Sequence, residues 1–311
     1  MSDFRLGLIG AGPWGRRCIA TISRLPGVVL ARVASKNPET ASLVGPDCKL
    51  SPTWESVAFA RDLDGIMIAT PGPTHAAITR AAIAGNLPAF VEKPLTQDPS
   101  QAMEILDLAR RRRGLVMVDH IFLFHSGYEE IKKRLPALGP VRRMISSGGN
   151  RGPFRAGTSP LWDYGPHDVS VALDLMGDAS VSIQAVREKS ETVPAGLGEN
   201  FKLEMTFGSG ARAESRIGNL FPARERRFEF HFSGRALVLD DGPKTLALHP
   251  LGPGGQLGPG ENLPISPELP LDRAIKAFVA AVRSGEKDLS GLKLGVDVVA
   301  LLSECERQLG R

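Results

Sequence analysis

Few cysteines and no long apolar run mark this sequence, and both absences narrow its class. Its 311 residues contain three cysteines, and these have neither the spacing of a metal site nor that of a disulfide framework: Cys18, Cys48 and Cys305. No stretch approaches the roughly 18 apolar residues of a membrane span. The first residues also lack the basic, apolar and cleavage segments of a signal peptide. We therefore expect a cytoplasmic protein that uses neither disulfides nor a membrane.

Signatures of several other classes are also missing. There is no Gly-x-Ser-x-Gly elbow and no P-loop, and the six histidines form no metal-ligand cluster. The formal charge of +4 does not indicate nucleic acid, because no aromatic motif accompanies it. The densest basic run, residues 110–113, ends a helical pattern before Gly114, where cations favour a helix C-terminus. We expect no metal and no nucleic-acid partner.

The first 120 residues alternate between strand and helix patterns. Such alternation predicts a parallel sheet covered by helices. We therefore predict an α/β dinucleotide-binding domain with a doubly wound parallel sheet over residues 1–120. The expected elements, strands and helices together, are 6–9, 14–25, 28–34, 65–69, 74–84, 89–91, 100–113 and 115–118.

Residues 121–311 have a different pattern, one helix followed by consecutive short strands. Glycine-containing turns separate neighbouring strands, which predicts an α+β substrate-binding domain with a mostly antiparallel sheet. A Gly- and Pro-rich stretch near the end is expected to be irregular. Two closing helices could pack back on the first domain. The expected elements are helix 166–176, strands 182–187, 201–207, 211–217, 227–233 and 235–239, irregular 252–270, and helices 271–283 and 292–309.

A glycine pattern directly follows the first strand and opens the first helix. Gly10 permits a tight turn, Gly12 lets the backbone approach a pyrophosphate, and Gly15 permits close packing of helix and strand. The helix N-terminus offers free amides to the phosphates. In this context the pattern predicts a dinucleotide cradle rather than an ordinary turn, with Pro13 and Trp14 as part of it.

The end of the second strand bears on the choice of cofactor. An acidic residue there would bind the ribose hydroxyls of NAD, but residues 33–37 include none. Ser35 and Lys36 suit a 2′-phosphate, which favours NADP over NAD, although the lysine could also be incidental in a solvated turn. The segment that begins with Thr70 and Pro71 and ends at His75 is expected to line the cofactor crevice.

Lys93 stands directly after a strand, at the carboxyl edge of the predicted sheet where ligands of such folds bind. Pro94 restricts the backbone beside it. The ammonium group could stabilise negative charge on a reacting oxygen. The alternative is a surface lysine that pairs with Glu92.

Asp163 and His167 are four residues apart, which places them on one face if a helix begins near Asp163. An imidazole can carry a proton to and from a hydroxyl near neutral pH, and the carboxylate could orient it. Two alternatives remain: Asp163 or Asp168 could cap the helix, and the histidine could be a packing residue. Three further residues are weaker candidates for contact with substrate, namely Arg151, Arg155 and Tyr164.

Together these motifs resemble the Gfo/Idh/MocA oxidoreductases, a family named for glucose–fructose oxidoreductase and inositol dehydrogenase. The resemblance implies an N-terminal Rossmann domain and a C-terminal domain whose open sheet commonly forms homodimers or homotetramers. It also implies a catalytic trio of Lys93, Asp163 and His167, with His167 as acid and base. It rests, in chain order, on the glycine loop, Ala69-Thr70-Pro71-x-x-x-His75, Glu92-Lys93-Pro94, Asp163-x-x-x-His167, residues 208–217 and Gly234.

The resemblance leads us to expect hydride transfer between NADP(H), or NAD(H), and a carbinol or carbonyl carbon of a sugar, cyclitol or sugar derivative. One departure from the family is Asp119-His120-Ile121-Phe122, where many members have Gly-x-x-x-Arg-Phe, so substrate contacts from this stretch cannot be carried over. Two alternatives stay open: a nucleotide-sensing regulator on the same fold, and a reductase of a non-sugar imine or conjugated double bond. An intact trio speaks against a pure sensor.

Overall fold

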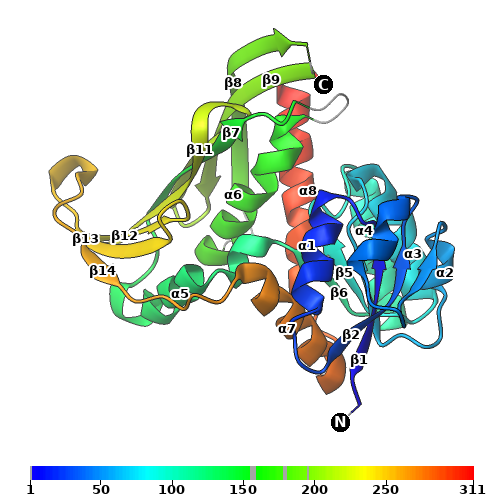
Figure 1. The fold of residues 1–311 in the computed structure, drawn as a ribbon. Coiled ribbons are helices and arrows are strands. Elements are labelled where there is room, and N and C mark those ends of the chain that lie inside the picture. Colours follow the sequence, from blue (N-terminus) through cyan, green and yellow to red (C-terminus); the bar gives the residue numbers. More distant parts are fainter. Residues whose placement is uncertain (1, 155–158, 178–180, 195) are drawn as a thin grey trace. The chain divides into compact units, whose positions relative to one another are not determined.

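The chain divides into two compact units in a computed structural model that describes residues 2–154, 159–177, 181–194 and 196–311. The first unit comprises Met1–Ile121 and Leu269–Val299, and the second comprises Phe122–Glu268 and Ala300–Arg311 (Figure 1). Among the described residues, no helix combines the length and apolarity that crossing a lipid bilayer requires.

The first unit is built on six parallel strands in the order β3-β2-β1-β4-β5-β6. The order reverses between β1 and β4, which is the switch point where open α/β sheets bind ligands at their carboxyl edge. This doubly wound Rossmann sheet confirms the predicted fold class. The strands are β1 (Phe4–Ile9), β2 (Val28–Ala34), β3 (Lys49–Ser51), β4 (Gly65–Ile68), β5 (Ala89–Glu92) and β6 (Val116–Asp119).

Helices connect these strands and end where their sequence signals predict. At the start of α4, the carboxylate of Asp98 accepts hydrogen bonds from the amides of Ser100 and Gln101. At its end lie the arginines 110–112, so the basic run does occupy a helix C-terminus. The helices of this unit are α1 (Pro13–Ile22), α2 (Glu55–Ala58), α3 (His75–Ala84), α4 (Pro99–Arg112), α7 (Pro270–Ser284) and the first part of α8 (Ser290–Gln308).

Helix α7 belongs to the core of the first unit although it lies late in the chain. The rings of Phe278 and Phe90 are 5.7 Å apart between centroids. A Cβ on Gly65 would lie 2.9 Å from the same Phe278 ring, so glycine is required where helix and sheet meet. On the surface, Arg24, two residues after α1, pairs with Asp272 of α7.

The second unit contains an eight-stranded mixed sheet in the order β14-β13-β12-β11-β7-β10-β9-β8 (Figure 1). Only β7 and β10 pair in parallel, which confirms the expected mostly antiparallel sheet for the described residues. The strands are β7 (Arg143–Arg151), β8 (Val181–Val193), β9 (Gly196–Phe207), β10 (Arg212–Gly218), β11 (Leu220–His231), β12 (Arg235–Asp240), β13 (Thr245–Pro250) and β14 (Glu261–Leu263).

Helix α6 (Pro160–Met176) packs on the middle of this sheet, against β7, β9 and β10. The end of α8 lies beside it, because a Cβ on Gly165 would come within 2.7 Å of the Leu302 side chain. Helix α5 (Ser126–Leu138) contacts β12. The sheet therefore fixes the helix that carries Asp163 and His167.

Two expectations for this half are wrong in part. The helix expected from residue 166 begins six residues earlier, at Pro160, and the stretch expected to be irregular includes β14. The sequence reading also missed α5 and the central strand β7. Instead of alternating large apolar residues, β7 has Gly148 and Gly149, whose side-chain space is filled by Arg226 and Phe221 from β11. Its sheet face is therefore completed by another strand, which no local pattern reveals.

Candidate functional site

The glycine loop joins β1 to α1 in the first unit. Gly10 has a φ of +98°, and a Cβ on it would lie 2.6 Å from the carbonyl oxygen of Ala69. A Cβ on Gly15 would lie 2.0 Å from the carbonyl oxygen of Gly10, so the turn itself requires both glycines. Beside Gly12, in contrast, a Cβ would meet no atom of the described residues within 4 Å. Because α1 begins next, at Pro13, open space adjoins free helix amides and suits a pyrophosphate.

The turn after β2 is held by its own side chains. Ser35 Oγ accepts hydrogen bonds from the Thr40 hydroxyl at 2.9 Å and from the amide two residues later at 3.1 Å, and Lys36 is exposed. An acidic group that the sequence reading missed is also here. Glu39 pairs with Arg16 of α1 at 2.8 Å, and this guanidinium lowers the pKa of Glu39. The turn therefore offers a serine hydroxyl and a lysine, with one carboxylate already neutralised by an arginine.

His75 is held between two backbone segments. Its ring is buried, with Nδ1 2.8 Å from the carbonyl oxygen of Pro94 and Nε2 2.7 Å from that of Thr70. Burial lowers the pKa of His75, and a neutral ring can donate to only one carbonyl at a time. Because both nitrogens face backbone groups, His75 braces the segment at Pro71 against the one that follows Lys93. Direct contact between His75 and the cofactor stays a prediction.

Lys93 lies immediately after β5, at the carboxyl edge of the Rossmann sheet. Its side chain is only 14% exposed, and Nζ is 3.9 Å from Oε1 of Glu92. The peptide bond to Pro94 is cis. Lys93 is thus largely buried, unlike an ordinary surface lysine, although it does have Glu92 as a charge partner.

Glu92 and Asp119 end the neighbouring strands β5 and β6, where they are direct cross-strand partners. Both Asp119 oxygens and Oε2 of Glu92 are buried without a well-aligned hydrogen-bond donor among the described residues. Burial raises the pKa of Asp119 to about 7 and that of Glu92 well above its ordinary range. The indole of Trp14, in the first turn of α1, lowers the pKa of Asp119. The pKa of the Cys18 thiol, also on α1, is raised by burial and by both carboxylates. Two acids therefore meet at the sheet edge beside one lysine.

In the second unit, Asp163 and His167 lie on α6. The side chain of Ser159 caps the helix by accepting a hydrogen bond from the amide of Leu161 at 3.2 Å. Asp163 therefore lies in the first turn, one turn before His167, and both are partly exposed. The alternative that Asp163 or Asp168 caps the helix is wrong.

Asp168 belongs to a fully buried polar network. Its two carboxylate oxygens accept hydrogen bonds from Arg226 and from Ser146, each at 2.6 Å. The hydroxyls of Ser146 and Ser215 lie 2.8 Å apart, and Ser215 is the donor there because the one Ser146 proton goes to Asp168. The Arg226 guanidinium occupies the space above Gly148, where a Cβ would lie 2.3 Å from it. This network, which the sequence reading missed, fixes the residue next to His167.

Phe122 connects this network to His167 within the second unit. Arg226 lies 5.0 Å from the centre of the Phe122 ring, and the ring meets His167 edge-on with centroids 5.2 Å apart. On the other side, His125 stacks on Phe122 at 6.5 Å. His167 is thus packed against an aromatic ring that a buried arginine holds in place.

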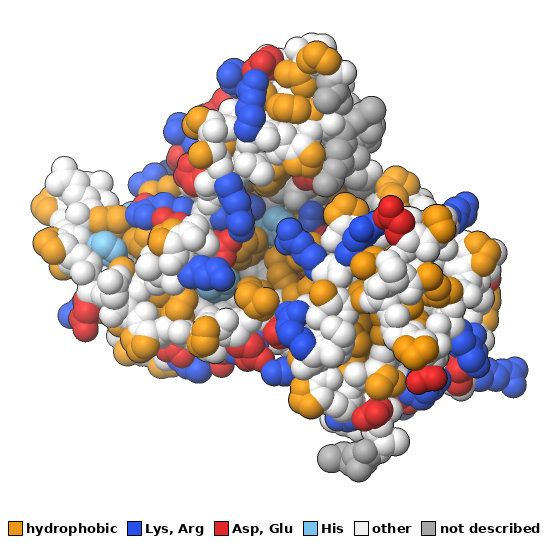
Figure 2. Space-filling model, in the orientation of Figure 1, with side chains coloured by type: hydrophobic (Ala, Val, Ile, Leu, Met, Phe, Trp, Pro, Cys, Tyr) orange, Lys and Arg blue, Asp and Glu red, His pale blue; other side chains and the backbone are white. Residues whose placement is uncertain are grey.

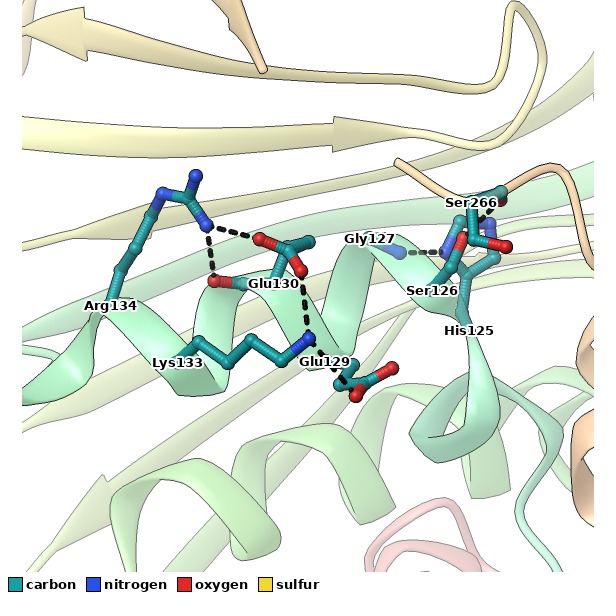
Figure 3. A network of polar contacts seen from close by, with 8 residues as sticks. All are labelled: His125, Ser126, Gly127, Glu129, Glu130, Lys133, Arg134 and Ser266. Atoms are coloured by element: carbon teal, nitrogen blue, oxygen red, sulfur yellow. Dashed lines mark hydrogen bonds and ion pairs between the residues drawn. The ribbon is translucent and has the colours of Figure 1, made fainter. Parts of the chain in front are cut away.

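The segment after Phe122 is anchored where α5 begins. His125 caps α5 by accepting a hydrogen bond from the amide of Gly127 at 3.0 Å, and Ser126 donates to the carbonyl oxygen of Ser266 at 2.7 Å (Figure 3). Further along, Lys133 bridges Glu129 and Glu130 on the surface of the helix (Figure 3). His125 and Ser126 therefore have structural roles.

Two of the three weaker candidates for substrate contact, Tyr164 and Arg151, lie in the described part of the chain. The Tyr164 hydroxyl donates to the carbonyl oxygen of Gly152 at 3.1 Å. Arg151 pairs with Glu191 at 3.2 Å and lies 5.6 Å from the centre of the Phe154 ring. Arg155 lies outside the described residues. The structure thus gives Tyr164 and Arg151 partners within the second unit.

Charge elsewhere is dispersed. On the face shown in Figure 2, basic and acidic side chains are interspersed instead of forming one basic patch. Within the described residues, no group of three His, Cys, Asp or Glu side chains is arranged to hold a metal ion.

Comparison with known proteins identifies the family. A model described as the NAD-binding Rossmann fold of the Gfo/Idh/MocA oxidoreductase family matches residues 4–120, and the C-terminal domain model of the same family matches residues 137–238. The chain belongs to this family. It is accordingly an NAD(P)-dependent oxidoreductase, and the recognition made from its motifs is confirmed.

Two curated relatives illustrate the range of the family. The chain is 26% identical to UDP-N-acetylglucosamine 3-dehydrogenase of Acidithiobacillus ferrooxidans, over 82% of this chain and 79% of the relative. It is 29% identical to an inositol 2-dehydrogenase of Mycolicibacterium gilvum, over 92% and 84%.

Two solved structures share the fold across the whole chain. An oxidoreductase of Magnetospirillum magnetotacticum is 39% identical with a TM-score of 0.92, covering 98% of this chain and all of that one. A biliverdin reductase of a Synechocystis species, in complex with biliverdin and NADP⁺, is 21% identical with a TM-score of 0.80 and covers 99% of both chains. Proteins of this fold therefore act on chemically different substrates.

Proposed function

We propose that this oxidoreductase transfers a hydride between NADP(H) and a carbinol or carbonyl carbon of a sugar, cyclitol or sugar nucleotide. The sugar-type substrate is supported by the relatives named for UDP-N-acetylglucosamine and inositol. The observation that carries the proposal is the largely buried ammonium of Lys93 at the carboxyl edge of the Rossmann sheet.

The first unit would hold the cofactor. The open space at Gly12 and the free amides of α1 suit the pyrophosphate. Ser35 and Lys36 would bind the 2′-phosphate of NADP, and Arg16 could join them if it released Glu39. Bound there, a nicotinamide supplies or accepts the hydride. NAD stays the alternative, because one exposed lysine is the only cation in the turn itself.

Each of the proposed catalytic residues has a separate task. In the reductive direction the reacting oxygen gains negative charge, which the Lys93 ammonium stabilises. His167 then gives this oxygen its proton, and in the oxidative direction it takes the proton away. Asp163, one helical turn earlier, orients the imidazole or a substrate hydroxyl. No other residue of the chain needs to change its protonation state in this scheme.

The self-association expected from the resemblance is also part of the proposal. The exposed face of the second sheet carries ion pairs between neighbouring strands, among them Arg143 with Glu214 at 3.8 Å and Lys202 with Glu214 at 3.5 Å. A second copy would therefore meet a polar surface, and we propose a homodimer or homotetramer with a salt-sensitive interface. Light scattering at low and high salt measures this directly.

Turnover tests the function. Absorbance of the reduced nicotinamide is followed with NADP(H) or NAD(H) and a panel of sugars, cyclitols, sugar nucleotides, imines and enones. Lys93→Met should lower turnover by about 10²–10³-fold, and His167→Asn by about 10²–10⁴-fold. Lys287→Met and His249→Asn, which change the same residue types elsewhere, should leave it unchanged.

The outcomes separate the candidate functions. The proposal is supported if the unaltered protein turns over a sugar-type substrate and both Lys93→Met and His167→Asn lose this turnover. Turnover restricted to an imine or enone would contradict the proposed substrate class, but the protein would still be an oxidoreductase. Tight binding of cofactor without any turnover would favour the nucleotide-sensing regulator.

A further inference from the structure

The edge of the Rossmann sheet beside Lys93 contains more acid than base. Glu92 and Asp119 are direct partners on adjacent parallel strands, so their side chains leave the sheet on the same face. Asp119 is completely buried, and the Glu92 side chain is 17% exposed. Two carboxylates thus lie side by side at a largely buried place.

Neither acid obtains enough hydrogen-bond donors from its surroundings. Three of the four carboxylate oxygens are buried without a well-aligned donor among the described residues. The nearby donors are the Trp14 indole, which lowers the pKa of Asp119, and the backbone amide of Lys93, which lowers that of Glu92. An ionised carboxylate only accepts hydrogen bonds, so two of them cannot satisfy each other, whereas a protonated one can donate to its neighbour. A proton between the two groups would therefore supply the missing donor.

The charges of the neighbouring groups also indicate that one proton is bound by the pair. Within the first unit, the Lys93 ammonium lies 3.9 Å from Glu92. Burial raises the pKa of the Cys18 thiol well above its ordinary value and lowers the pKa of His75, so both of these groups are neutral. The Trp14 indole, from α1, carries no charge. One ammonium balances one carboxylate, and the second carboxylate remains unbalanced unless it binds one proton.

We propose that Glu92 and Asp119 share a single proton at neutral pH, and that Asp119 in this way acts as a positioning residue that leaves one negative charge opposite Lys93. Asp119 need not touch substrate, because it acts through Glu92. If the pair lost its proton, a second buried negative charge would draw the ammonium away from a reacting oxygen. This consequence for catalysis rests on the proposed function, but the shared proton does not.

Infrared spectroscopy of the whole protein tests the proton directly. The C=O stretch of a protonated carboxyl group is separate from the carboxylate bands. A pH titration should therefore show one group that loses its proton near the Asp119 pKa of about 7. Asp119→Asn and Glu92→Gln should each abolish this band at neutral pH, since the remaining carboxylate is balanced by Lys93. Glu104→Gln, an exposed control on α4, should retain it.

The same measurement reads the link to Lys93. Lys93→Met removes the balancing ammonium, so the band should persist to a pH higher by about one unit or more. Absence of the band in the unaltered protein, or its survival in both carboxyl variants, overturns the shared proton. An unmoved midpoint in Lys93→Met overturns the coupling.

A pH profile of turnover adds the functional readout. The unaltered enzyme should lose turnover as the pH rises through about 7. Because His167 must also carry its proton in the reductive direction, Asp119→Asn should show a smaller fall than the unaltered enzyme. Coincident profiles, with the infrared band present, would overturn the positioning role. If no substrate were turned over, the proposed function would fail while the infrared result still decided the proton.

Discussion

The two units each bury a cluster of charged side chains, and the clusters differ in balance. In the second unit, Asp168 receives hydrogen bonds from both Arg226 and Ser146 at 2.6 Å. In the first, Glu92 and Asp119 present three buried oxygens without well-aligned donors among the described residues, and Nζ of Lys93 lies 3.9 Å from Glu92. One cluster satisfies its charges, and the other leaves a charge for a proton to neutralise.

This difference separates a structural role from a functional one. The satisfied cluster holds β7, β11 and α6 together and keeps Phe122 against His167. The unsatisfied cluster costs stability, and such groups persist mainly where a site uses them. From this comparison we infer that Arg226 in the second unit has a structural role. Glu92 and Asp119 in the first unit set the charge beside Lys93.

Breaking the balanced cluster should have the largest effect. Arg226→Met leaves the buried Asp168 without its cation, which costs about 3–5 kcal/mol of unfolding free energy. Chemical denaturation measures the loss. The double variant Asp168→Leu/Arg226→Met removes both charges and should recover most of it. A loss below about 1 kcal/mol in the single variant would mean that the pair is not a structural element.

The unbalanced cluster should appear in the pH dependence of stability. Asp119 has a pKa of about 7 when folded, against an ordinary value of 3.8, so the folded protein binds more protons between these values. Stability therefore falls as pH rises through this window, by about 1.4 kcal/mol per pH unit for one proton, and levels off above it. Denaturation of Asp119→Asn should lack this slope. Parallel curves for the two proteins would contradict the unbalanced pair.

A smaller change sharpens the comparison within the balanced cluster. Ser146→Ala removes one hydrogen bond to Asp168 but leaves Arg226 in place, so we expect a loss of about 1 kcal/mol. Ser42→Ala, at an exposed position, is the matched control and should change stability by less than about 0.5 kcal/mol. A loss as large as that of Arg226→Met would show that the charge balance is not what matters there.

The sequence predicted those elements whose conformation is determined by residues close together in the chain. The apolar runs of β1, β2 and β5, the glycine loop and the arginine-rich end of α4 all follow from neighbouring residues. The same holds for the spacing of Asp163 and His167, which share a face of α6. Both fold classes were therefore predictable.

What the sequence reading missed depends on partners distant in the chain. Strand β7 does not look like a strand, because Gly148 and Gly149 leave room for Arg226 and Phe221. Asp119 could be paired with Glu92 only once the order and register of the sheet were known. The contacts of the His75 ring with two backbone carbonyls were missed as well.

The most direct test of the account is cofactor binding by the unit with the unbalanced charges. Calorimetric titration with NADPH compares the unaltered protein with Gly12→Val and with Gly45→Val, since both glycines face open space without a positive φ. A valine in the proposed pyrophosphate position should weaken binding about tenfold to a hundredfold, as forcing groups into filled space costs about 1–3 kcal/mol. Gly45→Val should bind normally. Unchanged affinity in Gly12→Val would contradict the cofactor site and the function built on it.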